Sequence, residues 1–208
     1  MIDYLDPVRP VQYGMLGLDG SNSAMRQVTR QVAFDGAWDA ERSDKVRDLF
    51  DGMAHEWHNR VAADRRAPLA DAVERGDVSR GLVLELGSGI GDSTGFIETN
   101  IGPTVSVDIA MEMLVRAPTD TIRVRGDAGR LPFENGTADS IVLINALLFP
   151  AEIERVLAPG GTVVWVNTSG EHTPIFLSSE DLVAALPGDW SGFASRADRG
   201  TWAVVRRT

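Results

Sequence analysis

The stretch that most constrains the fold is residues 82–91, LVLELGSGIG, in which a short apolar run leads into three alternating glycines. An apolar run of this length, bounded by glycines, is typical of a central parallel strand, which is covered on both faces and need not alternate. Glu85 interrupts the run, and a polar ligand or a water network is the natural partner of a carboxylate in a buried strand. Because glycine allows a sharp turn and a close backbone approach, the stretch predicts a buried strand followed by a ligand-binding turn.

Two kinds of cofactor commonly use a glycine turn after a strand: nicotinamide or flavin dinucleotides and S-adenosylmethionine. A dinucleotide fingerprint requires glycine or alanine three positions after its second glycine, where Asp92 stands here. The spacing G-x-G-x-G after Glu85 instead resembles the first motif of the class I S-adenosylmethionine-dependent methyltransferases. In that family the acid helps to bind the methionine ammonium, and the glycines pass under the nucleoside. The residues that the resemblance assigns to the cofactor at this turn are Glu85, Gly87, Ser88, Gly89 and Gly91.

Two later strands are predicted to end in, or lead into, acidic residues. Residues 104–108, TVSVD, end at Asp108, about twenty residues after the first glycine, a spacing at which a carboxylate reaches the ribose hydroxyls in either nucleotide family. Residues 121–125 alternate and lead into 126–134, GDAGRLPFE, which closely resembles the G-D-A-x-x-L-P-F segment of the methyltransferases. There the aspartate accepts a hydrogen bond from the adenine amine, and a dinucleotide enzyme has no reason to carry this phrase. The resemblance implies adenine contacts for Ile109, Gly126, Asp127 and Ala128.

The strand predicted at residues 139–144 ends at Asn145. In methyltransferases of this class that end faces the methionine half of the cofactor and the transferred methyl group, which implies cofactor contact for Asn145 and substrate contact for Phe149. The family usually has a longer segment before its P-G-G turn, so we expect a widened substrate entrance. A strand at 162–166 leads into a polar loop that carries His172, and loops beyond the carboxyl ends of strands in open α/β sheets lie near the ligand. The same loop position makes His172 a candidate substrate contact.

The N-terminal region divides into two parts. Residues 1–40 carry little regular pattern and are predicted to form an arm or lid. From Ser43 apolar residues recur every three or four positions, which predicts a helix with one apolar face. Within it, residues 49–58, LFDGMAHEWH, resemble the F-D-x-x-A-x-x-Y-D entry segment of ubiquinone and menaquinone methyltransferases, which caps the cofactor and contributes to the substrate chamber. Trp57 and His58 stand where that family has Tyr and Asp and are candidate substrate contacts, although core packing explains the apolar stripe more simply.

Composition disfavours several classes of site and partner. The 208 residues include no cysteine, which removes disulfides, thiolate nucleophiles and thiolate zinc sites. No metal site is predicted either, because His55 and His58 lack an identifiable third ligand. The formal charge of −10 disfavours a nucleic acid as substrate, because neutralising phosphates needs a basic surface. With no visible signal peptide and no long apolar run, the chain is expected to have no membrane span and to be a cytoplasmic monomer or homodimer.

These patterns predict an α/β fold with a Rossmann-like, doubly wound, mostly parallel sheet of seven strands that ends in an antiparallel C-terminal hairpin. Residues 1–78 form an N-terminal arm and helical cap in this interpretation. Residues 79–208 form the S-adenosylmethionine-binding core.

The resemblance implies an S-adenosylmethionine-dependent methyltransferase that acts on a small-molecule acceptor, with an O, N or C nucleophile, by in-line methyl transfer. Such an enzyme mainly aligns the reactants in a dry cavity, and a general base is needed only if the acceptor must lose a proton. His172 and His58 are the candidates for that base. Two alternatives stay open. One is a nicotinamide-binding Rossmann oxidoreductase, which Asp92 and residues 126–134 disfavour, and the other is a cofactor-binding partner protein without turnover, which the shortened segment after Asn145 favours.

Overall fold

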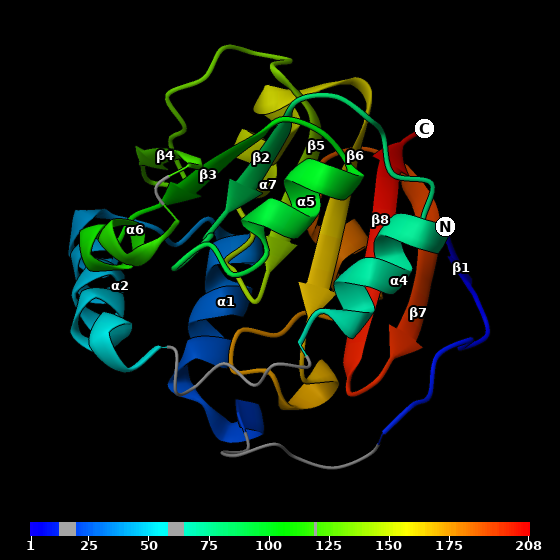
Figure 1. The fold of residues 1–208 in the computed structure, drawn as a ribbon, viewed down its shortest axis with the longest axis horizontal. Coiled ribbons are helices and arrows are strands. Elements are labelled where there is room, and N and C mark those ends of the chain that lie inside the picture. The colour runs from blue at the N-terminus through cyan, green and yellow to red at the C-terminus, as the bar shows by residue number, and fades with distance from the viewer. Residues whose placement is uncertain (13–19, 58–64, 119) are drawn as a thin grey trace.

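The described residues of the computed structural model are 1–12, 20–57, 65–118 and 120–208, and they form a mixed α/β fold around one sheet (Figure 1). Within them the sheet has eight strands, in the order β1-β7-β8-β6-β5-β2-β3-β4. The strands are β1 (Ile2–Tyr4), β2 (Val83–Leu86), β3 (Thr104–Asp108), β4 (Ile122–Arg125), β5 (Ala138–Ile144), β6 (Leu157–Asn167), β7 (Trp190–Ala197) and β8 (Gly200–Arg207). The predicted α/β class is confirmed, but the predicted number of seven strands was wrong.

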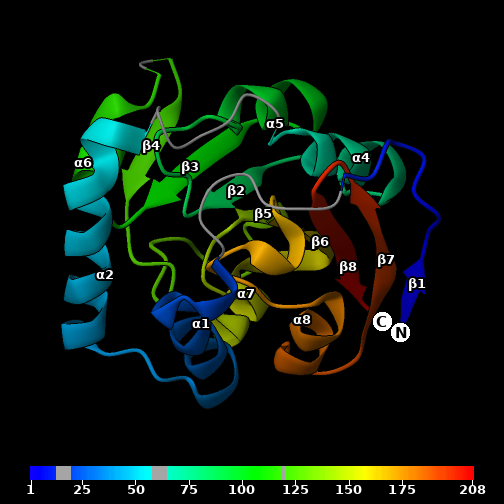
Figure 2. The ribbon, with the colours of Figure 1, turned by 90° about the horizontal axis from the view of Figure 1, so that it is seen from below.

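Helices cover both faces of this sheet. The α-helices are α1 (Ala24–Asp35), α2 (Ala40–Met53), α4 (Ala67–Arg75), α5 (Thr94–Asn100), α6 (Met111–Arg116), α7 (Pro150–Val156) and α8 (Ser179–Ala185), and the 3-10 helices are η1 (Gly20–Asn22), η2 (Ala54–Glu56) and η3 (Gly170–His172). Figure 2 shows α4 and α5 on one face of the sheet and α1, α7 and α8 on the other. In the described parts of the chain, no helix is both long and apolar enough to cross a membrane.

The order of the strands reverses beside β2. From β2 the chain adds β3 and then β4 on one side, and it then returns to place β5 and β6 on the other side, all in parallel pairing. In open α/β sheets a ligand binds beyond the carboxyl ends of the strands at such a reversal. The last strand, β8, runs antiparallel to both β6 and β7 and so forms the predicted hairpin. The doubly wound topology therefore places the candidate site at the carboxyl ends of β2, β3 and β5.

The additional strand is β1, which forms one edge of the sheet. It pairs in parallel with β7, with Ile2 opposite Gly192. Three residues are too few to show the alternation that reveals a strand in a sequence. Helix α1 also departs from the prediction of an irregular arm for residues 1–40. Its N-cap Ser23 and the following Gly36, with a φ of 61°, are ordinary helix boundary signals, but polar residues within the helix dilute its apolar period.

A buried carboxylate joins α4 to β8 on one face of the sheet. Asp71 of α4 is fully buried, and its Oδ2 accepts hydrogen bonds from Trp202 Nε1 at 2.7 Å and from Arg75 Nη1 at 3.1 Å. Trp202 itself belongs to an apolar cluster that also contains Leu69 of α4 and Val164 of β6. Because a carboxylate in the core is stable only when it is paired and hydrogen-bonded, these contacts fix how α4 packs on the sheet.

Replacing Asp71 by alanine is expected to lower the free energy of unfolding by about 3 to 5 kcal/mol, because it leaves the buried indole N–H of Trp202 and the partly buried guanidinium of Arg75 without their acceptor. Urea denaturation followed by circular dichroism measures this loss. The matched control is Glu41→Ala, which removes one side of an exposed ion pair with Lys45 at 2.6 Å and should cost under about 1 kcal/mol. Equal losses in the two variants would contradict a structural role for the buried carboxylate.

Candidate functional site

The glycine turn after β2 lies between the ends of its two neighbouring strands. Gly87 N–H donates a hydrogen bond to the carbonyl of Val107 in β3 at 2.9 Å. On the other side, a Cβ added to Gly87 would lie 2.9 Å from the Cβ of Ala146, which follows β5. Gly87, Gly89 and Gly91 have φ values of 67°, 56° and 74°, a region that residues with side chains rarely adopt. Only glycine therefore suits this turn, as the sequence predicts.

Asp108, at the end of β3, ties the turn to the neighbouring strands. The residue is 9% exposed, and its Oδ2 accepts a hydrogen bond from Gly89 N–H at 2.7 Å. Its Oδ1 accepts one from Ala110 N–H at 2.8 Å, and its carbonyl accepts one from Gly126 N–H at 3.0 Å. Burial raises the pKa of Asp108, and the two N–H donors to the carboxylate oppose that rise. The predicted residues Gly89, Asp108 and Gly126 are thus in direct contact.

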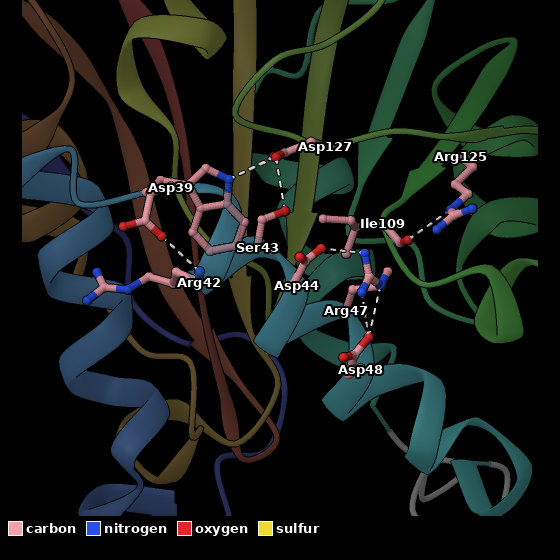
Figure 3. A network of polar contacts seen from close by, with 10 residues as sticks. Asp39, Arg42, Ser43, Asp44, Arg47, Asp48, Ile109, Arg125 and Asp127 are labelled. Carbon is pink, nitrogen blue, oxygen red and sulfur yellow. Dashed lines mark hydrogen bonds and ion pairs between the residues drawn. The ribbon is translucent and has the colours of Figure 1, made fainter.

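Asp127 follows β4 and is bonded to the N-terminal part of the chain (Figure 3). Its Oδ2 accepts hydrogen bonds from Trp38 Nε1 at 2.9 Å and from Ser43 Oγ at 3.3 Å. Its Oδ1 accepts hydrogen bonds from Gly129 N–H at 2.8 Å and from Trp38 Nε1 at 3.1 Å. The sequence did not indicate Trp38 or Ser43 as site residues. The available signal was a lone tryptophan in the short connection between the end of α1 and Asp39, the N-cap of α2.

The remaining predicted adenine contacts, Ile109 and Ala128, are both half-buried. The carbonyl of Ile109 accepts a hydrogen bond from Arg125 Nε at 3.4 Å (Figure 3). Ala128 packs against the main apolar core on the α7 side of the sheet. Contact of either residue with adenine stays a prediction.

Glu85, in the middle of β2, receives its hydrogen bonds from neighbouring hydroxyl groups. It is 3% exposed, and its Oε2 accepts hydrogen bonds from Thr94 Oγ1 at 2.5 Å and from Ser106 Oγ at 3.1 Å. Burial raises its pKa to about 7, and the two hydroxyl donors oppose the rise. Thr94 belongs to α5 and Ser106 to β3, so the carboxyl group joins three elements. A role for Glu85 in binding the methionine ammonium stays a prediction.

Asn145, the residue after β5, is bonded through both amide atoms to one partner. Its Nδ2 donates a hydrogen bond to Thr168 Oγ1 at 2.8 Å, and its Oδ1 accepts one from Thr168 N–H at 2.9 Å. Its φ of 51° is one of the few positive values of a non-glycine residue in the described chain. The reciprocal pair joins the ends of β5 and β6, and no sequence motif marks Thr168 as a site residue. Contact of Asn145 with a cofactor stays a prediction.

Two of the predicted substrate residues lie beside the predicted cofactor residues. A Cβ added to Gly89 would lie 3.8 Å from Trp57 Nε1, so the tryptophan covers the glycine turn. Trp57 also packs against an apolar cluster that includes Ile90. The ring of Phe149 meets the ring of Trp38 edge-on, with 5.1 Å between their centroids.

Of the two candidate bases, the structure describes His172, which ends the 3-10 helix η3. The backbone carbonyl of His172 packs closely on the N-terminal segment, because a Cβ added to Gly20 would lie 2.5 Å from it. His58 lies outside the described residues. The catalytic and substrate roles of both histidines stay predictions. Within the described residues, no group of three or more histidine, aspartate or glutamate side chains could hold a metal ion.

An apolar cluster lies beyond the carboxyl ends of β5 and β6. Its buried members come from α2 and from the segments that follow these two strands, and half-buried residues of α1 and of its connection to α2 pack against them. The cluster consists of Val46, Leu147, Ile175, Met25, Val28, Trp38, Phe50 and Phe149. The cluster lies next to the connection that reaches Asp127.

The raised pKa of Glu85 gives the ligand-free protein a specific pH dependence. Folding raises the pKa of Glu85 from 4.5 to about 7, so the folded protein binds the carboxyl proton more tightly than the unfolded chain does. The resulting stabilisation of the folded state is fully present below pH 4.5 and is lost as the pH rises through 7. The free energy of unfolding should fall over this range by on the order of 3 kcal/mol. Glu85→Gln stays neutral and should remove this decrease, as measured by urea midpoints between pH 5 and 8. The exposed Glu134→Gln is the control, and a decrease that persists in Glu85→Gln would show that another group causes it.

Comparison with known proteins identifies the family. Residues 84–165 match the family model described as methyltransferase domain. The demethylmenaquinone methyltransferase of Mycolicibacterium gilvum (strain PYR-GCK) is 30% identical over 171 residues, which cover 74% of this chain and 74% of that protein. That of Lactococcus lactis subsp. lactis (strain IL1403) is 27% identical over 162 residues, which cover 67% of this chain and 64% of that protein.

Solved structures show the same fold. A DhpI–SAH complex aligns with a TM-score of 0.64 at 21% identity and covers 79% of this chain and 96% of that chain. The [4+2]-cyclase SpnF aligns with a TM-score of 0.55 at 20% identity and covers 71% of this chain and 75% of that chain. Together with the family model and the relative that is 30% identical, they show that the chain belongs to the class I S-adenosylmethionine-dependent methyltransferases.

Proposed function

We propose that the carboxyl ends of β2, β3, β4 and β5 bind S-adenosylmethionine, the cofactor of this methyltransferase family. The observation that carries the proposal is that the glycine turn, Asp108 and Asp127 lie at the carboxyl ends of the adjacent strands β2, β3 and β4, where Gly89 N–H bonds to Asp108. The residues fit the cofactor chemically, because carboxylates accept hydrogen bonds from ribose hydroxyls and from an adenine amine. In addition, Ser88 Oγ is buried at the turn without a hydrogen-bond partner, which a bound ligand would supply.

The chemistry of the reaction places modest demands on the protein. The bound cofactor supplies an activated methyl group and departs as a neutral thioether. The residues of this chain then have to hold the acceptor in line with the methyl group and keep water out. Trp57 covers the glycine turn and suits the second of these tasks. His172 and His58 are retained as candidate bases for an acceptor that must lose a proton.

The acceptor that fits best is a small molecule with an apolar ring system. The apolar cluster beyond β5 and β6 supports this class, because it places aromatic and aliphatic side chains beside Trp38, which is bonded to Asp127. Two relatives are named for the methylation of demethylmenaquinone. Membership of the methyltransferase family does not favour the nicotinamide oxidoreductase or the partner protein without turnover. A cytoplasmic location, a monomeric or homodimeric state and the absence of a nucleic-acid partner stay predictions of the sequence.

The division into a cap of residues 1–78 and a core of residues 79–208 also stays a prediction. Two elements of the cap region are built into the core packing. β1 pairs with β7, and α4 packs on β8 through Asp71 and Leu69. We therefore propose that the part of this region that moves as a cap over the site consists of α1, α2 and the connection between them.

The cofactor site is tested by titrating the protein with S-adenosylhomocysteine in a calorimeter. Asp108→Ala should weaken binding at least about tenfold, because a hydrogen bond to a charged group contributes about 1.5 to 3 kcal/mol. The matched control is Asp139→Ala, because Asp139 likewise accepts a backbone hydrogen bond, from Leu82 N–H at 2.8 Å, at the opposite end of β2. This control should leave the Kd unchanged. A folded wild-type protein that does not bind would overturn the cofactor site, and equal losses in both variants would indicate a structural effect.

The acceptor class is tested by incubating the protein with S-adenosylmethionine and a short-chain demethylmenaquinol. We expect release of S-adenosylhomocysteine and a methylated product, both detected by mass spectrometry. Ile175→Asp, which places a charge in the apolar cluster, should raise the KM for this acceptor at least about tenfold. Turnover with charged small acceptors, and none with apolar ones, would exclude the proposed class.

A further inference from the structure

Trp38 donates its indole N–H to Asp127, the residue proposed to bind the adenine amine. We propose that Trp38 is an internal ligand of the adenine site, whose indole N–H occupies Asp127 until the cofactor displaces it. This inference rests on the proposed role of Asp127 in adenine recognition. In this inference the connection between α1 and α2, which carries Trp38, changes its position when the cofactor binds.

Three groups of the protein donate hydrogen bonds to the carboxylate of Asp127. A carboxylate offers about four acceptor positions. Gly129 N–H and Ser43 Oγ each fill one, and the indole N–H of Trp38 lies within 3.1 Å of both oxygens. The single indole N–H is shared between the two oxygens, so the adenine amine competes with it for the remaining acceptor positions. Gly129 belongs to the same turn as Asp127, so its hydrogen bond persists, and Trp38 is the stronger of the two donors that come from elsewhere in the chain.

The indole also fills space at this carboxylate. A Cβ added to Gly129 would lie 3.0 Å from Trp38 Cδ1 and 3.1 Å from Phe149 Cε1. The two rings therefore sit directly on the turn that carries Asp127. A planar ring with an exocyclic amine resembles an indole in size and in donor chemistry. The exchange of one for the other keeps Asp127 hydrogen-bonded in both states, which limits its cost.

The connection around Trp38 links its displacement to the helices on either side. Trp38 N–H donates to the carbonyl of Gly36 at 2.8 Å, and Arg42 Nη1 donates to the carbonyl of Ala37 at 2.5 Å. Asp39 caps α2 by accepting a hydrogen bond from Arg42 N–H at 2.8 Å. In this proposal the displacement of Trp38 shifts α1 against α2, because the ring packs with Val28 of α1 and Val46 of α2.

That shift has a consequence for the acceptor. Val28 of α1 and Val46 of α2 pack with Trp38 and Phe149 in the apolar cluster proposed for the acceptor. Moving Trp38 removes one member of the cluster and loosens the contact between the two helices there. Cofactor binding therefore opens the acceptor site, and the cofactor binds first.

The test is Trp38→Phe, which keeps an aromatic ring and removes the N–H donor. Without the competing hydrogen bond, S-adenosylhomocysteine should bind about fivefold to tenfold more tightly in a calorimetric titration. Trp190→Phe is the matched control, because Trp190 Nε1 also donates one hydrogen bond, to the carbonyl of Pro187 at 2.8 Å, and lies in β7. Its Kd should equal that of the wild-type protein. Circular dichroism confirms that each variant is folded.

Hydrogen exchange provides the second measurement. Saturating S-adenosylhomocysteine should raise amide exchange in residues 24–53 of the wild-type protein, because the cap is released. In Trp38→Phe this exchange should already be raised without the ligand. Weaker or unchanged binding by Trp38→Phe, or ligand protection of residues 24–53, would overturn the displacement and show that Trp38 supports the bound cofactor. If neither wild-type protein nor Trp38→Phe binds, the cofactor site itself fails, and the inference fails with it.

Discussion

The hydrogen bond from Gly89 N–H to the carboxylate of Asp108, at 2.7 Å, is the contact on which the site depends. It joins the turn after β2 to the end of β3, and the carbonyl of Asp108 extends the connection to Gly126 after β4. The positive φ of Gly89 lets its N–H point at the carboxylate without the strain that a side chain would add. Three strand ends therefore form one surface instead of three separate loops.

The acids of this surface all have protein donors in the described structure. Glu85 is bonded to two hydroxyl groups, Asp108 to two backbone N–H groups, and Asp127 to an indole, a hydroxyl and a backbone N–H. These donors hold each acidic side chain in place without a ligand, although burial still raises the pKa of Glu85. Binding at Asp127 then means exchanging one donor for another, and the affinity measures the difference between them. The proposed displacement gives Trp38, which lies between α1 and α2, a part in the equilibrium of cofactor binding.

The sequence predicts the parts of this arrangement that have a local pattern. The glycine turn and the acid at the end of β3 follow from short motifs, because the backbone geometry of a tight turn and the end of a strand restrict which residues fit there. The edge strand β1 has only three residues, too few for a recognisable period. The pairing of Trp38 with Asp127 joins residues 89 positions apart, and that of Asn145 with Thr168 joins residues 23 apart. Such contacts arise from tertiary packing, which no local period encodes.

Helix α2 shows why the two halves of the cofactor site cannot act independently. Ser43 in its first turn is bonded to Asp127, at the adenine end of the proposed site. Beyond its last residue, Trp57 covers Gly89 at the opposite end, and in between Asp51 accepts a hydrogen bond from Glu112 N–H at the start of α6. A helix is stiff over this length because its backbone hydrogen bonds run along it. In the proposed displacement, any movement that frees Asp127 from Trp38 is therefore transmitted along α2 toward the glycine turn that Trp57 covers.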